Sequence, residues 1–366
     1  MCKLASKINN LEVFVHVSTT YCNHNLKKSC YEEKLYEPCQ DWRVILKLIE
    51  TENPAVMNTI SYKIIEDHPN TYTFSKSLSE KIVEEYSSKF PAVIARPSVV
   101  FGIYSDPVPG WTDNVYGLLG ISTAVTKGVM RVMKGRSDCC LDYIPVDVAI
   151  NALIISSWEK ANSENNELSI YNCAYADSVA VTFKELGMTA LSDGMNDGST
   201  IFDNDIWYPF LLLTTNDFYF HFLFYTLQVI PAVLIDSILY LMKKERRLMK
   251  LTITIYQAIQ ALSPFTMKEI KFNNRKYHAL WEKLSADEAE VFLTRPPSDF
   301  NKTDIILLGH RGLKKYFLKE NLADNELHMK KLRRLYYLHQ FTKGILIILV
   351  FTSLYKLMNL AINIYI

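Results

Sequence analysis

The amino-acid sequence predicts an α/β protein, with a partial parallel sheet in the first half, a mostly helical second half and a hydrophobic tail. Two observations support this prediction. Within residues 1–190, short apolar runs rich in β-branched residues alternate with helical patterns, which is typical of a parallel sheet with crossover helices. From Ile206 onward the sequence is helical, aromatic and apolar, and it contains no convincing strand.

Three strands and three helices are expected in the first half. The strands are residues 11–17 (LEVFVHV), 92–101 (AVIARPSVVF) and 168–175 (LSIYNCAY), and the helices are residues 41–50, 70–86 and 146–159. In the helix at 70–86, apolar residues recur at steps of four and form a buried stripe, namely Phe74, Leu78, Ile82 and Tyr86. A turn-rich linker is expected at 191–200 (LSDGMNDGST).

Charge and cysteine content exclude some classes of partner. The 366 residues include 40 basic and 39 acidic side chains, a formal net charge of +1, so bulk electrostatics give no reason to expect nucleic acid as a partner. Hydrophobic residues make up 49% of the chain, which indicates a membrane-associated part that contacts lipid. The seven cysteines are odd in number and lack paired CxxC spacing, so we expect reduced thiols and no metal.

Four side chains in the first half suggest redox chemistry on a carbonyl group. Ser18 and Thr19 follow the expected strand at 11–17, and Tyr72 and Lys76 lie one helical turn apart. The positive charge of Lys76 would favour the phenolate form of Tyr72, whose pKa starts near ~10. Tyr72 could then donate a proton to a carbonyl oxygen, while Thr19 or Ser18 hydrogen-bonds the developing oxyanion. This arrangement resembles the catalytic group of short-chain dehydrogenases/reductases.

Each part of this pattern also has a purely structural interpretation. A tyrosine four residues before a lysine is common by chance, and a Ser-Thr-Thr run after a strand usually forms a turn or a helix cap. The Arg-Pro-Ser sequence at 96–98 could simply end a strand at Pro97.

Longer motifs give a more specific resemblance. In the first half they are FVHVSTTYCN (14–23), HPNTYTFSKSLSEK (68–81), IARPSVVFG (94–102), PVPGWTDNVYGLLG (107–120) and DYIPVDVAINALI (142–154). In the second half they are WYPF (207–210), FTMKEIKF (265–272), ALWEKLSADEAEVF (279–292) and LLGHRGLKKYFLKE (307–320). In this order the chain resembles insect-type fatty acyl-CoA reductases, which are extended short-chain dehydrogenases/reductases with a second, C-terminal domain.

The resemblance implies a Rossmann-type sheet and a reaction. Fatty acyl-CoA reductases use NADPH to reduce a long-chain acyl-CoA to a primary fatty alcohol in two hydride steps, with release of CoA. Tyr72 would be the proton donor in both steps, Thr19 the likelier oxyanion partner, and Lys76 a further contact to the nicotinamide ribose. The nicotinamide ring would be bordered by Pro97, Ser98, Val99 and Val100.

The resemblance also implies a substrate contact. Gly110 and Trp111, in the PVPGWTDN loop, would lie over the acyl or pantetheine path. The alternative is a structural turn made by Pro109 and Gly110.

One expected motif is absent. A dinucleotide-binding fold needs a glycine-rich turn after its first strand, but the first glycine of this chain is Gly102. We therefore expect the first nucleotide-binding units to be missing and the reductase domain to be N-terminally truncated. The alternative function is a catalytically incompetent membrane- or lipid-binding member of the same family. An epimerase or steroid dehydrogenase would share the Tyr-Lys pair but would not explain the second half.

The predicted domains follow from these motifs. They are a truncated NAD(P)-binding reductase domain (1–190), a linker (191–205), a helical C-terminal domain (206–330), and a basic flank with a membrane-anchoring tail (331–366).

Two apolar segments are candidates for the bilayer. Phe218–Ile235 precedes the basic residues 243–247, so a crossing there would place positive charge on the wrong side, and we expect an interfacial or re-entrant segment. Gly344–Ile366 follows the basic run 330–334 and could cross once, the alternative being a buried amphipathic helix. We therefore expect a membrane-associated protein whose catalytic part faces the cytosol, at the endoplasmic reticulum or a peroxisome.

Overall fold

The computed structural model describes residues 1–175, 181–196, 198, 200–296, 301, 304–320, 322 and 325–365. Its elements up to residue 173 are α1 (Cys2–Ala5), β1 (Phe14–Val17), η1 (His24–Leu26), β2 (Cys30–Tyr31), α2 (Trp42–Thr51), α3 (Pro54–Ile64), α4 (Thr71–Tyr86), β3 (Ala92–Pro97), β4 (Val99–Phe101), α5 (Gly117–Thr126), β5 (Val132–Lys134), β6 (Cys140–Leu141), β7 (Tyr143–Pro145), α6 (Val146–Asn162) and β8 (Ser169–Cys173).

The following elements are mostly helical. They are β9 (Val181–Thr182), α7 (Phe183–Met188), η2 (Thr189–Asp193), α8 (Gly194–Asn196), β10 (Leu212–Thr214), α9 (Asp217–Phe224), η3 (Tyr225–Val229), α10 (Ile230–Leu241), α11 (Leu248–Thr266), β11 (Lys271–Phe272), α12 (Arg275–Trp281), α13 (Ala286–Val291), α14 (Asp304–Gly312), η4 (Leu313–Leu318) and α15 (Asn325–Tyr365). The predicted α/β class, with a parallel sheet followed by a mostly helical part and an apolar tail, is confirmed.

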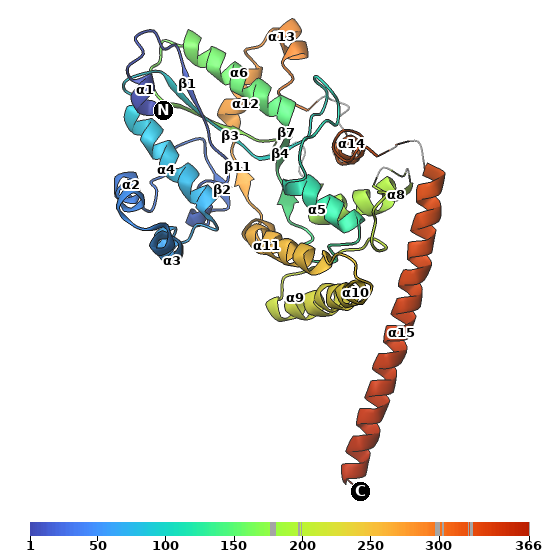
Figure 1. Cartoon of the computed structure of the whole chain (residues 1–366). Helices are drawn as coiled ribbons and strands as arrows, with labels where there is room; N and C mark the ends of the chain where they lie inside the picture. The colour runs from blue at the N-terminus through green and yellow to red at the C-terminus, as the bar shows by residue number, and fades with distance from the viewer. Residues whose placement is uncertain are drawn as a thin grey trace.

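A three-stranded parallel sheet in the order β1-β3-β8 forms the centre of the first half. Alternate residues of β3 point to opposite faces, as the two-residue period of a strand requires. Val93 and Ala95 pack in the cluster that contains α6, whereas Ala92 and Ile94 pack in the cluster that contains Val83 of α4. The helices α4 and α6 therefore cover opposite faces of the sheet (Figure 1).

Two predictions of strand position were wrong. The run 92–101 is not one strand, because β3 ends at Pro97, Ser98 donates its N–H to the carbonyl oxygen of Cys173 (3.0 Å), and β4 then pairs with β7 instead. The second half is not free of strands, because β10 pairs with β5 and β11 pairs with β2. These strands are only two or three residues long and have no pattern of their own; their partners from the first half define them. In addition, residues 191–196 of the expected linker are helical, in η2 and α8.

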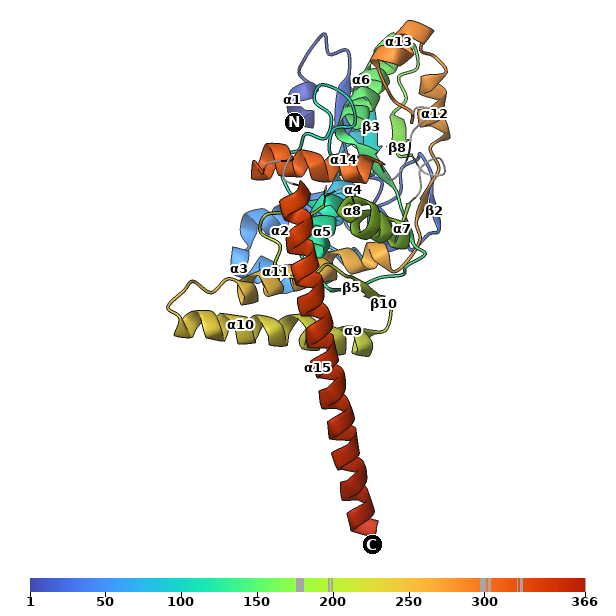
Figure 2. The same cartoon turned by 90° about the vertical axis from the view of Figure 1, so that its right-hand side faces the viewer.

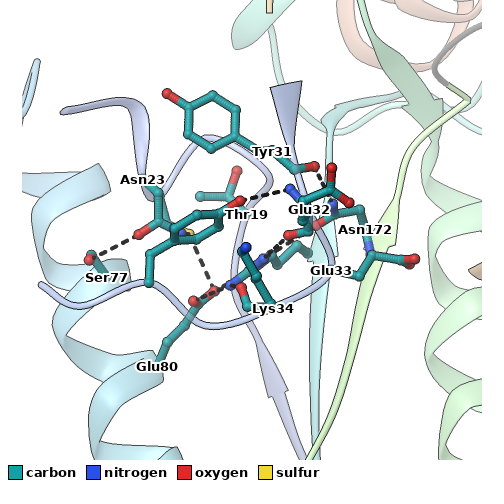
Figure 3. A network of polar contacts seen from close by, with 12 residues as sticks. Thr19, Asn23, Tyr31, Glu32, Glu33, Lys34, Ser77, Glu80 and Asn172 are labelled. Carbon is teal, nitrogen blue, oxygen red and sulfur yellow. Dashed lines mark hydrogen bonds and ion pairs between the residues drawn. The ribbon is translucent and has the colours of Figure 1, made fainter. Parts of the chain in front are cut away.

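A buried ion pair holds α4 against the sheet. Arg96 of β3 and Glu80 of α4 are 1% and 2% exposed, and they form two hydrogen bonds of 2.7 and 2.8 Å (Figure 3). Arg96 also donates to the carbonyl oxygens of Glu32 (3.3 Å) and Lys34 (2.9 Å). Burial by itself lowers the pKa of Arg96, but the adjacent Glu80 carboxylate raises it above its ordinary value. The guanidinium thus joins a strand, a helix and the loop after β2.

The same network reaches the second half of the chain. Asn172 of β8 donates to the carbonyl oxygens of Tyr31 (3.1 Å) and Asn273 (2.7 Å). The Glu33 carboxylate accepts the backbone N–H groups of Asn172, Lys276 and Tyr277, and Figure 3 shows Glu33 beside Asn172. These bonds fix the start of α12 against the central sheet.

Two helices in the described part of the chain are long and apolar enough to cross a membrane by length and composition, Asp217–Leu241 and Glu326–Ser353. The second belongs to α15, which extends away from the body on the same side as α9 and α10 (Figures 1 and 2). The apolar window within Glu326–Ser353 is not buried inside the described part of the protein, which gives no support to the alternative of a buried amphipathic helix; a membrane-crossing tail stays a prediction.

The buried ion pair gives a first prediction. Glu80→Gln leaves the Arg96 guanidinium buried without its counter-ion, so we expect the free energy of unfolding to fall by about 3–5 kcal/mol in urea denaturation. The matched control is Glu84→Gln on the same helix. Glu84 pairs with Lys81 at the surface, and losing an exposed pair costs about 0–1 kcal/mol. Equal losses in the two variants would contradict the structural role of the Glu80–Arg96 pair.

His68 gives a prediction for acid stability. Its side chain is 4% exposed, and neither ring nitrogen has a hydrogen-bond partner in the described part of the chain. Burial, reinforced by the nearby His24, lowers its pKa from 6.5 to about 4. The folded state disfavours the protonated ring, so His68 makes the free energy of unfolding depend on pH. Its stabilising contribution is fully present above pH 6.5 and is lost as the pH falls from 6.5 towards 4, by about 3 kcal/mol at most.

We therefore expect the free energy of unfolding of the wild-type chain to fall over this pH range. The variant His68→Phe should show a flatter pH profile, measured by urea denaturation at each pH. An unchanged slope in the variant would show that other groups cause the acid sensitivity.

Candidate active site

A cavity of about 560 Å³ lies where β1 and β3 end. Five of the predicted site residues line it, namely Thr19, Tyr72, Ser98, Val99 and Val100. Much of its remaining wall is apolar and comes from α5, from Leu141 and Tyr143, from Phe183 and from the C-terminal end of α11. The first and second halves of the chain therefore build this cavity together.

The loop after β1 places one hydroxyl on the cavity wall. Backbone pairing with β3 continues past the end of the strand, because the N–H of Ser18 bonds the oxygen of Ala95 (2.7 Å) and that of Thr20 bonds the oxygen of Pro97 (3.1 Å). Thr19 is 5% exposed and lines the cavity, whereas Ser18 is equally buried but does not line it. The structure thus separates the two hydroxyls that the sequence left as alternatives.

Tyr72 lies in the first turn of α4. Asn70 caps this helix, since its side-chain oxygen accepts the N–H of Thr73 at 2.9 Å. The Tyr72 side chain is 53% exposed on the cavity wall, so its phenol is open to a ligand.

Lys76 lies one turn further along α4. Its Nζ donates to the carbonyl oxygen of Val17 (2.7 Å) at the end of β1, and it lies 5.9 Å from the centre of the Tyr72 ring. The ammonium group is therefore held between the phenol and the loop that carries Thr19. The catalytic roles of Tyr72, Lys76, Thr19 and Ser18 stay predictions.

Residues 98–100 form another part of the wall. Ser98 is 5% exposed, and its hydroxyl has no hydrogen-bond partner in the described part of the chain. Val99 and Val100 follow it in β4, and Val100 is partly exposed to the cavity. Pro97 pairs with Cys173 in the sheet and does not line the cavity.

Gly110 and Trp111 lie elsewhere. Gly110 has a φ of +76°, and a Cβ atom there would lie 2.7 Å from the carbonyl oxygen of Leu308 in α14. Gly312 of the same helix approaches so closely that its own Cβ would overlap the oxygen of Gly110. This loop thus packs directly on α14, outside the cavity wall, and its predicted contact with the acyl or pantetheine path stays a prediction.

Sequence reasoning missed the contribution of α11. Its residues Ala261, Leu262 and Phe265 line the cavity, and the Phe265 ring lies 5.3 Å from that of Tyr21 and 4.9 Å from that of His24. The motif at 265–272 marked this region as family-like, but no pattern could link it to Thr19, because more than 240 residues separate them.

The residues of the cavity fit one end of a nicotinamide dinucleotide. A buried hydroxyl without a partner (Ser98), two valine side chains and a nearby ammonium group suit an amide-bearing ring and its ribose. The described glycines with positive φ are Gly110, Gly117, Gly128 and Gly198, and none of them follows a strand of the central sheet. Among the described residues, no group of three or more His, Cys, Asp or Glu side chains could hold a metal ion.

Two family models match parts of the chain. Residues 1–153 match a family model described as "Male sterility protein" for an NAD-binding domain, and residues 227–320 match a second model with the same description. Among solved structures, the terminal R domain of the myxalamid biosynthetic pathway is 17% identical with a TM-score of 0.45, over 83% of this chain and 58% of that chain.

Curated relatives cover nearly the whole chain. The "Fatty acyl-CoA reductase wat" of Drosophila melanogaster is 31% identical over 98% of this chain and 68% of its own length. The "Fatty acyl-CoA reductase 1" of Xenopus laevis is 30% identical over 99% of this chain and 69% of its own length. The chain therefore belongs to the fatty acyl-CoA reductase family.

Proposed function

We propose that the cavity is the site of an NADPH-dependent reduction of long-chain acyl-CoA to a primary fatty alcohol, with release of CoA. The observation that carries this proposal is the presence of Tyr72 and Thr19 on the wall of one apolar cavity, with the Lys76 ammonium held at the end of β1 beside them. Membership of the fatty acyl-CoA reductase family supports the same reaction.

Each polar residue has a defined role in this proposal. Tyr72 donates the proton to the carbonyl oxygen of the thioester, and later to that of the aldehyde. Thr19 donates a hydrogen bond to the same oxygen as negative charge develops on it, and Ser18 supports the position of this loop. Lys76 supplies a positive field and a contact to the nicotinamide ribose. The dinucleotide, when bound beside Pro97, Ser98, Val99 and Val100, supplies one hydride per reduction step.

The apolar wall suits a long acyl chain. Leu118 and Ile121 of α5 and Leu262 and Phe265 of α11 offer methyl groups and a ring, and burial of alkyl chain against such a surface is favourable by about 0.8 kcal/mol per methylene. Gly110 and Trp111 are proposed to border the pantetheine path. In this view residues 1–190 form the reductase domain, 191–205 the linker, 206–330 the C-terminal domain and 331–366 the anchor.

We further propose that the protein works at a membrane surface. The helices α9 and α10 run crosswise to α15 (Figure 2) and expose large apolar side chains, among them Phe218, Phe222, Leu234 and Leu241. This arrangement suits α9 and α10 in the interface plane and α15 across the bilayer. The basic run 330–334 then lies on the cytosolic side of the endoplasmic reticulum or a peroxisome, together with the cavity.

A second candidate function is a non-catalytic, lipid-binding member of the family. The observation in its favour is that residues 1–101 contain no glycine and hence no glycine-rich turn of the kind that holds a pyrophosphate. Titration of the purified chain with NADPH, followed by tryptophan fluorescence, separates the two. Saturable quenching is expected for the enzyme, and no quenching together with retained acyl-CoA binding is expected for the lipid-binding protein.

Tyr72→Phe tests the proposed proton donor. We expect kcat for alcohol formation from palmitoyl-CoA to fall about 10²–10⁴-fold, because a positioned general acid contributes this much, while acyl-CoA binding is unchanged. The matched control is Tyr86→Phe at the far end of α4, which loses the same hydroxyl outside the cavity. Retained alcohol formation by Tyr72→Phe would remove Tyr72 from the mechanism.

A further inference from the structure

Arg131 is a partly buried cation outside the cavity described above. Its Nε donates to the carbonyl oxygen of Gly128 (3.0 Å), its Nη1 donates to that of Leu227 (2.6 Å), and its guanidinium lies 5.3 Å from the ring of Trp207. Within the described part of the chain, no carboxylate forms an ion pair with it. Burial alone lowers its pKa to about 10, so the group stays charged at neutral pH.

A second donor without a partner lies beside it. Gln228 of η3 is 4% exposed, and its side-chain oxygen accepts the backbone N–H groups of Arg131 (3.1 Å) and Val132 (3.3 Å). Its amide nitrogen has no partner in the described part of the chain. Leaving a buried donor unbonded costs about 1–3 kcal/mol, so an acceptor is expected at this position.

Both side chains line one small cavity of about 30 Å³, which also contacts Pro231 and Ile235 of α10. A space of this size admits an oxygen atom or two but no acyl chain or nucleotide. Among its polar lining residues, which also include Thr252, Arg131 offers a positive charge without an ion-pair partner and Gln228 an N–H donor without a partner in the described part of the chain. This donor set favours an anionic oxygen as the ligand.

The position of this cavity indicates where the anion comes from. Leu227 and Gln228 belong to the candidate membrane helix Asp217–Leu241. On the other side, Trp207 donates from its indole nitrogen to His339 of α15 (3.0 Å), which belongs to the other candidate membrane helix. Arg131 thus lies between the two segments that we place at the bilayer, beside an indole of the kind enriched at headgroup level.

We propose that Arg131 and Gln228 bind a phosphate oxygen of an anionic phospholipid, and that this site fixes α9–α10 and α15 on the membrane. The proposal rests on the membrane association proposed above. An anionic lipid neutralises the guanidinium, whereas a zwitterionic lipid brings no net charge. One charge-assisted bond of this kind is worth about a tenfold difference in affinity.

The test compares full-length protein on vesicles of phosphatidylcholine with vesicles that also contain phosphatidic acid, by flotation at about 1 M salt. At this ionic strength, exposed charges are screened within about 3 Å, whereas a partly buried pair is screened much less. We expect the wild-type chain to prefer the anionic vesicles about tenfold, and Arg131→Gln to lose most of this preference. The control Lys244→Gln removes one positive charge from the exposed loop after α10, and we expect it to keep the preference for anionic vesicles.

A second variant guards against misfolding of the first. Gln228→Glu keeps the oxygen that accepts the backbone N–H groups of Arg131 and Val132, and it adds a negative charge to the cavity that Arg131 also lines. We expect this variant to melt no lower than the wild type and to lose the preference for phosphatidic acid.

Other outcomes would overturn the proposal. If the wild type binds both kinds of vesicle equally, the proposed lipid site is contradicted but membrane association is not. If it binds neither kind, both proposals are contradicted. If Arg131→Gln, Gln228→Glu and the wild type all prefer phosphatidic acid equally, the preference comes from surface charge and not from this site. Loss of the preference in millimolar inorganic phosphate would identify a free-phosphate site instead.

Discussion

The buried ion pair between Arg96 and Glu80 is the interaction on which the rest of the structure depends. Two opposite charges in an apolar interior are stable only when they meet each other and fill their remaining hydrogen bonds. Here the guanidinium does so by holding α4, β3 and the loop that carries Glu32 and Lys34 in one arrangement. The position of α4 relative to β1 follows, and with it the distance between the side chains of Tyr72 and Lys76 and the hydroxyl of Thr19.

From this centre, polar contacts extend to the second half of the chain. Asn172 and Glu33 bind the backbone around residues 273–277, and β11 pairs with β2. The C-terminal end of α11 then closes the cavity, where Phe265 packs on the rings of Tyr21 and His24. The cavity therefore requires both halves, which explains why neither half of the sequence alone describes a substrate site.

The hairpin of α10 and α11 is organised in a different way. The helix α11 begins where the Asp236 carboxylate of α10 accepts the N–H groups of Leu248 and Met249, so these two helices form one hairpin. One side of the hairpin contributes Phe265 to the cavity, while α10 exposes apolar side chains such as Leu234 and Leu241. The exposed apolar face of α10 and the proposed catalytic residues therefore lie on opposite sides of this hairpin.

The sequence by itself determined the strongly periodic elements and the family. The helix α4, the buried strand β3 and the long helix α15 were predictable, because hydrophobic spacing is a local property. In the predicted stripe of α4, Phe74 and Leu78 are buried, whereas Ile82 and Tyr86 are only partly buried. The motifs around Thr19, Tyr72 and Ser98 correctly indicated residues that share a cavity. Only the tertiary structure decided the break at Ser98, the short strands β10 and β11, the choice of Thr19 over Ser18 as a wall residue, and the wall formed by α11. Each of these depends on a partner that is distant in sequence, and no local pattern encodes such a contact.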